Sequence, residues 1–282
     1  MSEIQSDEKV RSWVDGVAGN QVPADDRGLQ YGDGVFETIL VRDRVPRFLG
    51  LHLDRLRRGL ETLEIDFPAG DALRAEIAHA AAMTPALAVL KIVVTRGSAV
   101  RRGYRPAGEE RARRIVTLWP TAPIESDLLA RGVDVSVARL PLPGFSPFAG
   151  IKHLNRLENV LAGLRSGDAQ AFESLMLAAS GQVISGISSN VFVVKAGEIL
   201  TPPVDRVGVA GIMRQIVLRE APRLGLAARE RSLTLDDVFA ADAMFITNAR
   251  IGVVPVKRVR EHAFAMNEIT TRLRHAIEAL DA

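Results

Sequence analysis

The chain has 282 residues, of which 47% are apolar and 25% charged, with a formal net charge of +2 and no cysteine. This composition is typical of a globular protein long enough for one large or two modest domains. The lack of cysteine excludes disulfides, thiolate metal ligands and cysteine nucleophiles, and the small charge without a dense basic run disfavours nucleic-acid binding.

The ends and the histidines add three expected absences. The first residues are polar and acidic, unlike a secretory signal peptide, and no apolar run approaches the ~20 residues that a membrane helix needs. We therefore expect a cytoplasmic protein without a membrane segment. The five histidines lack paired ligand spacing, so no metal site is predicted; they are His52, His79, His153, His262 and His275.

The first part of the chain is predicted to read strand, turn, strand, helix, helix, strand, strand, and the strand before the turn is given no bounds. Apolar alternation and β-rich runs mark the strands, and apolar residues at helical spacing mark the helices. The strands are 35–41, 88–95 and 114–119, and the helices are 48–60 and 71–83. A turn at residues 32–34 precedes the first strand, and the proline-containing stretch 120–127 reads as a linker.

The second part alternates short strands with three helices. The expected strands are 133–140, 173–178, 183–184, 191–194, 199–201 and 243–247, and the expected helices are 153–166, 211–224 and 265–280. Segregated helices and strands indicate the α+β class, with a domain at 1–119, a linker at 120–127 and a domain at 128–282. No GxGxxG follows a strand, which excludes a Rossmann domain.

Lysine is scarce, and one of the five lysines differs from the others. Lys9 lies in the polar N-terminal segment, Lys195 at a hairpin tip and Lys257 at a strand end, while Lys91 is expected to face outward from a strand. Lys152 follows the apolar run Phe-Ala-Gly-Ile at the predicted start of helix 153–166. A lysine that attacks a carbonyl must be neutral, which partial burial favours. Position alone leaves the role of Lys152 open.

The sequence around Lys152, GIKHLNRLE at residues 150–158, resembles the lysine motif of the aminodeoxychorismate lyases, members of the fold-type IV pyridoxal 5′-phosphate (PLP) enzymes. Five further motifs resemble that family in the same order and cover nearly the whole chain. They are residues 26–37, 52–56, 95–98 with 102–104, 208–215 and 247–249.

The resemblance implies a two-domain enzyme, with a small N-terminal α/β domain and a larger β-rich C-terminal domain. It also implies PLP as cofactor and a homodimer whose sites lie near the subunit interface. Lys152 would carry PLP as a Schiff base and then act as general acid and base. The implied phosphate contacts are the Arg55 side chain, the helix-start backbone N–H groups of Ile212 and Met213, and Asn248 with Ala249. Without its motif, Arg55 would read as an exposed arginine on a helix face.

The resemblance also implies where the substrate binds. Phe36, Thr38 and Leu40 share one strand face by alternation, which lines the substrate pocket in the family; core positions are the alternative for Phe36 and Leu40. Branched-chain aminotransferases carry an arginine where Leu40 stands. D-amino-acid aminotransferases carry a tyrosine at Phe36 and a histidine at Gly103. Arg101 matches an arginine that reaches a substrate carboxylate across the dimer interface; a solvated loop arginine is the alternative.

One cofactor position departs from the family pattern. The family places a glutamate beside the pyridine nitrogen of PLP, where this chain has Ser185. A carboxylate keeps that nitrogen protonated and makes the ring a strong electron sink, which a hydroxyl does less well. This change impairs a transaminase more than a lyase, whose carbanion expels a leaving group at once. Glu173 is a weaker candidate for compensation.

The sequence thus predicts a lyase that converts 4-amino-4-deoxychorismate to 4-aminobenzoate and pyruvate in folate biosynthesis. The first alternative is a fold-type IV aminotransferase for D- or branched-chain amino acids, which Phe36, Leu40, Gly103 and Ser185 disfavour. The second is a non-catalytic PLP-binding homologue, for which Ser185 is the only argument.

Overall fold

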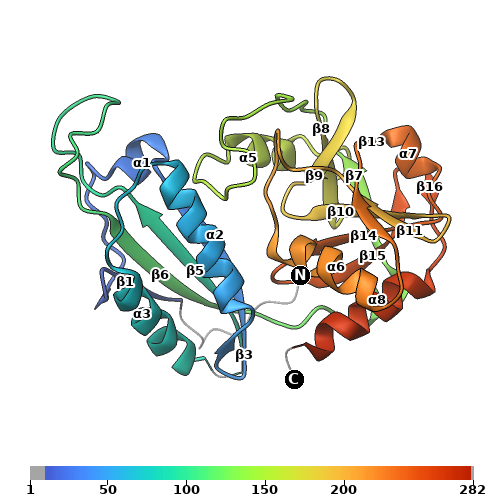
Figure 1. Cartoon of the computed structure of the whole chain (residues 1–282), viewed down its shortest axis with the longest axis horizontal. Helices are drawn as coiled ribbons and strands as arrows, with labels where there is room; N and C mark the ends of the chain where they lie inside the picture. The colour runs from blue at the N-terminus through green and yellow to red at the C-terminus, as the bar shows by residue number, and fades with distance from the viewer. Residues whose placement is uncertain (1–9, 85, 281–282) are drawn as a thin grey trace. The chain divides into compact units, whose positions relative to one another are not determined.

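The computed structural model describes residues 10–84 and 86–280, so Lys9 lies outside the described residues (Figure 1). The chain divides into two compact units. The first runs to Pro123 and also contains Ile151–Asn155; the second contains Ile124–Gly150 and continues from Arg156. The chain first passes between the units inside the predicted linker, and it returns to the first unit for five residues around Lys152.

The first unit is built on an antiparallel six-stranded sheet in the order β2-β1-β6-β5-β3-β4. Its strands are β1 (Arg11–Val14), β2 (Val17–Ala18), β3 (Gly34–Arg42), β4 (Val45–Pro46), β5 (Leu87–Thr95) and β6 (Arg113–Pro120). Its helices are α1 (Arg27–Tyr31), α2 (Leu49–Thr62) and α3 (Gly70–Ala82). The three strands and two helices with predicted bounds are present, and β1 lies before the turn, where a strand was expected; β2, β4 and α1 were missed because they are only two to five residues long.

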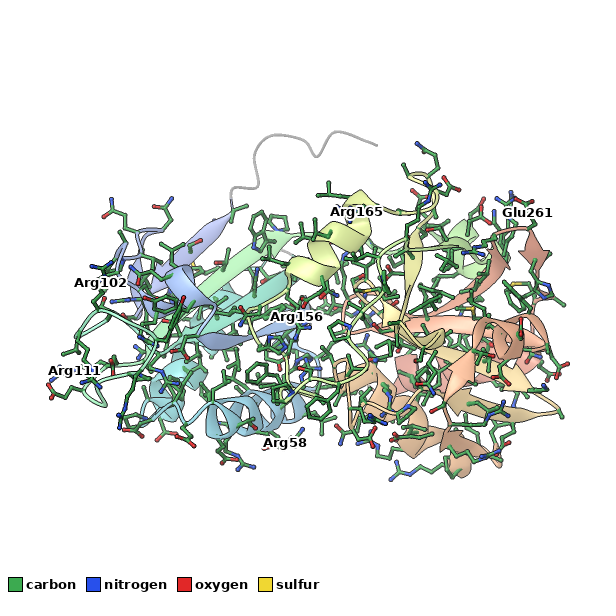
Figure 2. The ribbon with its side chains drawn as sticks, turned by 90° about the horizontal axis from the view of Figure 1, so that it is seen from above. Arg58, Arg102, Arg111, Arg156, Arg165 and Glu261 are labelled. Carbon is green, nitrogen blue, oxygen red and sulfur yellow. The ribbon has the colours of Figure 1, made fainter. Side chains whose placement is uncertain are left out.

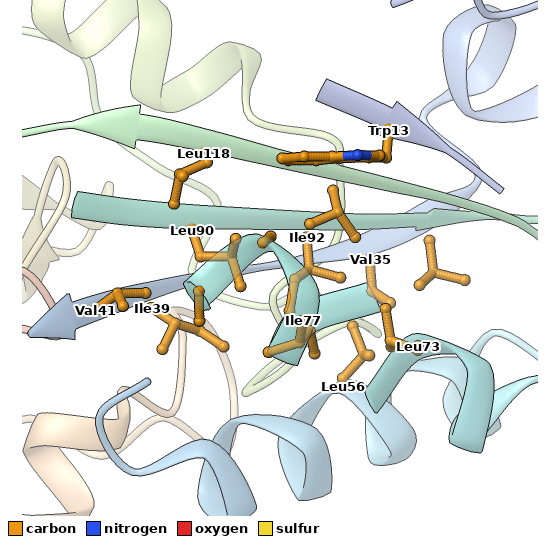
Figure 3. Close-up of a cluster of buried hydrophobic side chains, with 14 of the residues drawn as sticks. Trp13, Val35, Ile39, Val41, Leu56, Leu73, Ile77, Leu90, Ile92 and Leu118 are labelled. Atoms are coloured by element: carbon orange, nitrogen blue, oxygen red, sulfur yellow. The ribbon is translucent and has the colours of Figure 1, made fainter. Parts of the chain in front are cut away.

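The core of this unit lies between one sheet face and helices α2 and α3 (Figure 3). Val35, Ile39 and Val41 point into it from alternate positions of β3, and Leu56 and Ile77 meet them from the helices. Each such side chain contributes about 1.5–3 kcal/mol when fully buried. Because strand side chains alternate, Phe36, Thr38 and Leu40 must lie on the opposite face.

The second unit is built on a ten-stranded mixed sheet in the order β12-β11-β10-β14-β15-β7-β8-β9-β13, with β16 paired to β15. Its strands are β7 (Val133–Val137), β8 (Glu173–Leu177), β9 (Gln182–Gly186), β10 (Asn190–Lys195), β11 (Glu198–Thr201), β12 (Ala228–Glu230), β13 (Leu233–Thr234), β14 (Ala243–Asn248), β15 (Gly252–Val259) and β16 (His262–Ala263). Its helices are α4 (Ser126–Arg131), α5 (Leu157–Leu164), α6 (Ile212–Arg223), α7 (Leu235–Phe239) and α8 (Glu268–Ala279).

Strand β15 is the largest element that sequence reasoning missed. It contains Pro255, which usually argues against a central strand because proline lacks the N–H group. In this sheet Pro255 is paired with Phe245 on β14, and the pairing with β7 begins only at Val256. Position 255 therefore faces no β7 residue, and the proline is tolerated.

The helix predicted to begin at residue 153 is a second difference, because α5 begins only at Leu157. The backbone of residues 152–154 pairs with β3 instead. The Phe36 N–H donates to the Lys152 carbonyl at 2.9 Å, and the Leu154 N–H donates to the Gly34 carbonyl at 3.0 Å. These long-range bonds replace the first helical turn that the local spacing suggested.

The two sheets with separate helices confirm the α+β class. Within residues 10–84 and 86–280, no helix is long and apolar enough to cross a membrane. Among those same residues, no group of three potential ligands is placed to hold a metal ion.

Candidate active site

The lysine segment is held against strand β3 by an isolated β-bridge and two backbone hydrogen bonds. His153 forms an antiparallel bridge with Val35, between the two backbone bonds of Lys152 and Leu154. Strand β5 pairs with the same residues of β3 on its other side. The backbone at Lys152 is thus fixed by the sheet and not by a flexible loop.

The side chain of Lys152 lies over Phe36. The Lys152 Nζ is 4.2 Å from the centroid of the Phe36 ring, and the Nζ of Lys91 on β5 is 5.5 Å from the same centroid. Both distances are within the ~6 Å at which an ammonium is attracted to an aromatic face. Lys91 is exposed, as predicted, but it faces the same side of the sheet as Phe36.

The other two predicted substrate-face positions follow along β3. Thr38 is half-buried and is paired with Lys91 across the β3–β5 ladder. Leu40 is 4% exposed, and no arginine occupies its place. Phe36, Thr38, Leu40 and Lys91 therefore form one strip on the sheet face opposite the α2–α3 core.

Between these residues, Glu37 points to the other face and is fully buried. Its carboxylate accepts hydrogen bonds from Arg55 Nε at 2.7 Å and Arg55 Nη2 at 2.5 Å, and its Oε2 lies 2.6 Å from His52 Nδ1. Burial alone would raise the pKa of Glu37, but the neighbouring Arg55 and His52 lower that pKa from 4.5 to about 2. Burial lowers the pKa of His52.

Arg55 is therefore not an exposed residue of the helix face. It is 5% exposed, whereas Arg57 and Arg58 on the same helix are exposed. Two of its guanidinium nitrogens bind Glu37, which fixes the plane of the guanidinium fork. The pairing with Glu37 therefore orients the Arg55 guanidinium.

Arg101 lies on the long loop between β5 and β6. It is exposed, and its Nη2 donates to the Pro106 carbonyl at 3.0 Å. Gly103 lies on the same loop with a φ of +111°, a conformation that favours glycine. A histidine at that position would be strained.

In the second unit, helix α6 begins with the two residues whose backbone N–H groups the resemblance assigns to the cofactor phosphate. Ile212 and Met213 are its first residues, 2% and 1% exposed, and the N-cap residue Gly211 has no side chain with which to cap the helix. The backbone N–H groups of a first turn lack intrahelical partners and lie at the positive end of the helix dipole. A Cβ at Gly211 would lie 1.9 Å from Asn190 Oδ1, so any other residue there would displace the Asn190 side chain.

Thr247 adds a buried hydroxyl close to this helix start. It is paired with Asn190 across the β10–β14 ladder, so the two side chains share the sheet face on which Asn190 meets Gly211. Thr247 is 0% exposed, and its Oγ1 has no hydrogen-bond partner within the described part of the chain. A buried hydroxyl without a partner is costly and suggests a missing ligand or water.

Asn248 ends β14, and Ala249 follows it. The Asn248 Oδ1 accepts from the Arg250 and Ile251 N–H groups, both at 3.0 Å, and its Nδ2 donates to the Ser188 carbonyl at 3.2 Å. The Asn248 side chain therefore ties the β14 turn to the loop after β9.

Strand β9, just before that loop, contains the position that departs from the family pattern, Ser185. The Ser185 hydroxyl donates to the Gly186 carbonyl at 2.8 Å. Glu173 accepts hydrogen bonds from the backbone or hydroxyl groups of four residues, at 2.8–3.1 Å: Ser174, Ile187, Ser188 and Ser189. Its carboxylate thus holds the loop directly after Ser185.

Sequence reasoning missed the roles of Glu37 and Thr247. For Glu37 a signal existed, because alternation places a carboxylate on the same face as Val35 and Ile39, and a buried carboxylate requires a cationic partner. The partner itself, Arg55, could not be deduced from the strand. No sequence signal distinguishes Thr247 from an ordinary strand threonine.

The chain is similar to known proteins of one family over most of its length. The sequence model of the family described as Amino-transferase class IV matches residues 34–259. An aminodeoxychorismate lyase of Vibrio harveyi is 33% identical over 93% of this chain and 97% of that protein. A Methanocaldococcus jannaschii protein named as a branched-chain-amino-acid aminotransferase is 34% identical, over 88% and 87% of the two chains.

A solved structure extends the similarity to the fold. The crystal structure of 4-amino-4-deoxychorismate lyase from Pseudomonas aeruginosa superposes with a TM-score of 0.90 at 37% identity, covering 95% of this chain and 98% of that chain. Both the family match and the relatives span Lys152 and the start of helix α6. This chain belongs to the class IV aminotransferase family, whose members are PLP-dependent enzymes of fold-type IV.

Proposed function

We propose that the protein is an aminodeoxychorismate lyase, which converts 4-amino-4-deoxychorismate to 4-aminobenzoate and pyruvate. The observation that carries this proposal is the strip on the β3 face, where Lys152 lies over Phe36 beside Thr38 and Lys91. The names of the Vibrio harveyi and Pseudomonas aeruginosa relatives support the same reaction.

The residues present fit PLP. In the first unit, Lys152 is the amine that we propose binds the aldehyde carbon, and Arg55 is the proposed phosphate ligand. In the second unit, the N–H groups of Ile212 and Met213 are proposed for the phosphate, because an uncapped helix start with a buried, unpartnered hydroxyl favours an anion. Asn248 and Ala249 are proposed for the same group, and Ser185 for the pyridine nitrogen.

Lys152 is the proposed catalytic residue. PLP, when bound, supplies an electron sink for the charge that develops on the substrate. The Lys152 amine removes the proton from the ring carbon that bears the amino group. The carbon–oxygen bond to the enolpyruvyl group then breaks, the ring becomes aromatic, and the Lys152 ammonium returns a proton to the departing methylene to give pyruvate.

The charges on the β3 strip suit this substrate. The proposed substrate carries two carboxylates. Lys91 places a second ammonium, besides that of Lys152, on the face that holds Phe36 and Thr38. We propose that Lys91 attracts one carboxylate and that Phe36 and Thr38 contact the ring. Arg101 remains the proposed anchor for a carboxylate.

An aminotransferase for D- or branched-chain amino acids is the competing proposal, and the Methanocaldococcus jannaschii relative favours it. Two observations oppose it. Leu40 is a buried apolar residue, and the Ser185 hydroxyl donates to a backbone carbonyl, so it does not supply the negative charge that keeps a pyridine nitrogen protonated.

The decisive assay supplies aminodeoxychorismate in situ from chorismate and glutamine, and follows 4-aminobenzoate and pyruvate together. We expect equal amounts of both products from the wild type and at least ~10³-fold less from Lys152→Ala, because the general acid–base group is lost. Lys195→Ala, which removes a lysine at the β10–β11 turn, is the matched control and should retain activity.

Two other outcomes would overturn the proposal. Formation of pyridoxamine phosphate with a common amino acid, without 4-aminobenzoate, would establish the aminotransferase. A yellow, PLP-loaded protein with neither activity would establish a non-catalytic homologue.

We also propose that the protein is a homodimer. Helix α5 presents four apolar side chains at helical spacing that are 38–78% exposed, and a contiguous apolar face of this kind marks an interaction surface. They are Leu157, Val160, Leu161 and Leu164. Light scattering should give twice the 30.6 kDa chain mass, and a monomeric mass would refute the dimer.

A further inference from the structure

Residues 97–111, in the connection between β5 and β6, are called here the arginine loop because they include Arg101, Arg102, Arg105 and Arg111. All four are exposed, and Figure 2 shows Arg102 and Arg111 at the outer edge of the first unit. The two ends of the loop meet closely. Gly97 has a φ of +92°, and a Cβ there would lie 1.9 Å from the Arg111 carbonyl oxygen.

The tip of the arginine loop is held by a buried guanidinium on helix α1. Arg27 is 3% exposed, and it donates from Nη1 to the Gly103 carbonyl at 3.0 Å and from Nη2 to the Tyr104 carbonyl at 2.6 Å. The Tyr104 ring also contacts Tyr31, with centroids 5.4 Å apart. One planar fork therefore binds two consecutive carbonyls, directly after Arg101 and Arg102.

Arg27 is in turn fixed by the loop before β3. Its Nε donates to Asp33 Oδ2 at 2.9 Å, and Arg96 Nε donates to the same oxygen at 2.8 Å. Arg96 uses its other nitrogens on the Leu63 and Glu64 carbonyls at the end of α2. Asp33 thus links two arginines, of which Arg27 holds the arginine loop and Arg96 holds α2.

We propose that Arg27 is a positioning residue for the substrate anion, acting through the arginine loop. By binding the carbonyls of Gly103 and Tyr104, it orders the loop before substrate arrives, so that Arg101 and Arg102 present their charges in a fixed geometry. An ordered loop pays less conformational entropy on binding a carboxylate. Its effect on the substrate rests on the proposed function, whereas the ordering of the loop does not.

The ordering is tested by limited trypsin digestion of the full-length protein. Trypsin cleaves after Arg101 and Arg102 only when the loop opens, and mass spectrometry identifies the new ends. The Arg27→Gln variant should be cleaved after these residues on the order of tenfold faster than the wild type. It loses the two hydrogen bonds to the Gly103 and Tyr104 carbonyls and the positive charge that strengthens them.

Arg96→Gln is the matched control. It makes the same chemical change at the other partner of Asp33, without touching the carbonyls of the arginine loop, so its cleavage after Arg101 and Arg102 should stay at the wild-type rate. Arg27→Lys covers the case in which Arg27→Gln does not fold. A lysine keeps the charge but cannot form the planar fork, and an intermediate cleavage rate is expected.

The substrate part is tested in the lyase assay, where Arg27→Lys should raise KM on the order of tenfold with kcat nearly unchanged. If folded Arg27 variants are cleaved after Arg101 and Arg102 at the wild-type rate, the proposal that Arg27 orders the loop is wrong. Faster cleavage with an unchanged KM would overturn the link to substrate. A wild type without lyase activity would refute the proposed function alone, because the cleavage result is independent of turnover.

Discussion

The two units hold their candidate functional residues by different means. In the first unit, arginines bind carboxylates in ion pairs: the buried Glu37 binds the buried Arg55, and the half-buried Asp33 binds Arg27 and Arg96. In the second unit, the loop after Ser185 is held by one carboxylate that accepts N–H and hydroxyl groups, and helix α6 starts beside uncharged Asn190 and Thr247.

This difference predicts different sensitivities. Removing one partner of a buried ion pair strongly destabilises the folded protein, because the remaining charge stays buried without compensation. A carboxylate among neutral donors leaves only neutral groups behind when its charge is removed. The first unit should therefore respond more strongly to single charge changes and to acid than the second.

Glu37→Gln should give the largest change in stability. It removes the negative charge that binds the buried Arg55 guanidinium, and we expect a loss of about 3–5 kcal/mol in the free energy of unfolding. Urea denaturation at neutral pH measures it. A loss below about 1 kcal/mol would show that the Glu37–Arg55 pair does not organise this unit.

Acid should remove nearly the same interaction in the wild type. The pKa of Glu37 falls from 4.5 to about 2 on folding, so its stabilisation is complete above pH 4.5 and is lost as the pH falls toward 2. The linked free energy is about 3 kcal/mol. Because burial also lowers the pKa of His52, protonation of the unfolded chain below pH 6.5 adds a loss of the same sign.

Urea curves at several pH values measure this dependence, with Glu37→Gln as the comparison. The variant should lose the part of the slope that lies below pH 4.5. Parallel curves for the two proteins would contradict the assignment.

Glu173→Gln should have a smaller effect, about 1–3 kcal/mol, because the amide keeps one acceptor but turns N–H groups toward the Ser188 and Ser189 donors. Chemical denaturation measures it beside Glu37→Gln. A loss larger than that of Glu37→Gln would reverse the proposed contrast between the units.

Thr247→Val should have the smallest effect and the opposite sign. The hydroxyl is buried without a partner within the described residues, so its removal should stabilise the PLP-free protein by up to about 1 kcal/mol. If the hydroxyl serves the bound cofactor, PLP affinity should fall in the same variant. Thermal unfolding with and without PLP separates the two effects, and destabilisation of the PLP-free protein would contradict this expectation.

Local patterns predicted the elements whose hydrogen bonds are local or whose apolar faces are regular. The alternation in β3 placed Phe36 and Thr38 on one face correctly, and apolar spacing located helices α2 and α6 within two residues. Local patterns failed where hydrogen bonds to backbone far away in the sequence determine the structure. Residues 152–154 had helical spacing but pair with β3, and Pro255 argued against a strand that its neighbours accommodate.

The candidate site was predictable to a similar extent. Short contiguous motifs pointed to Lys152, Arg55 and the α6 start as candidate site residues, and their roles stay predictions. The buried pairing of Arg55 with Glu37 and the bonds of Arg27 to the arginine loop join residues 18 and 76–77 positions apart. Such pairings depend on strand order and loop path, which composition and spacing do not encode.

The return of five residues to the first unit has a consequence for how this protein can be divided or recombined. A gene fragment encoding residues 1–123 would lack the segment that carries Lys152, and one encoding 124–282 would carry the lysine without the β3 strand that orients it. No single cut separates two complete units. Module exchange between relatives therefore requires at least three coordinated junctions, and the two halves of this chain are expected to be inherited together.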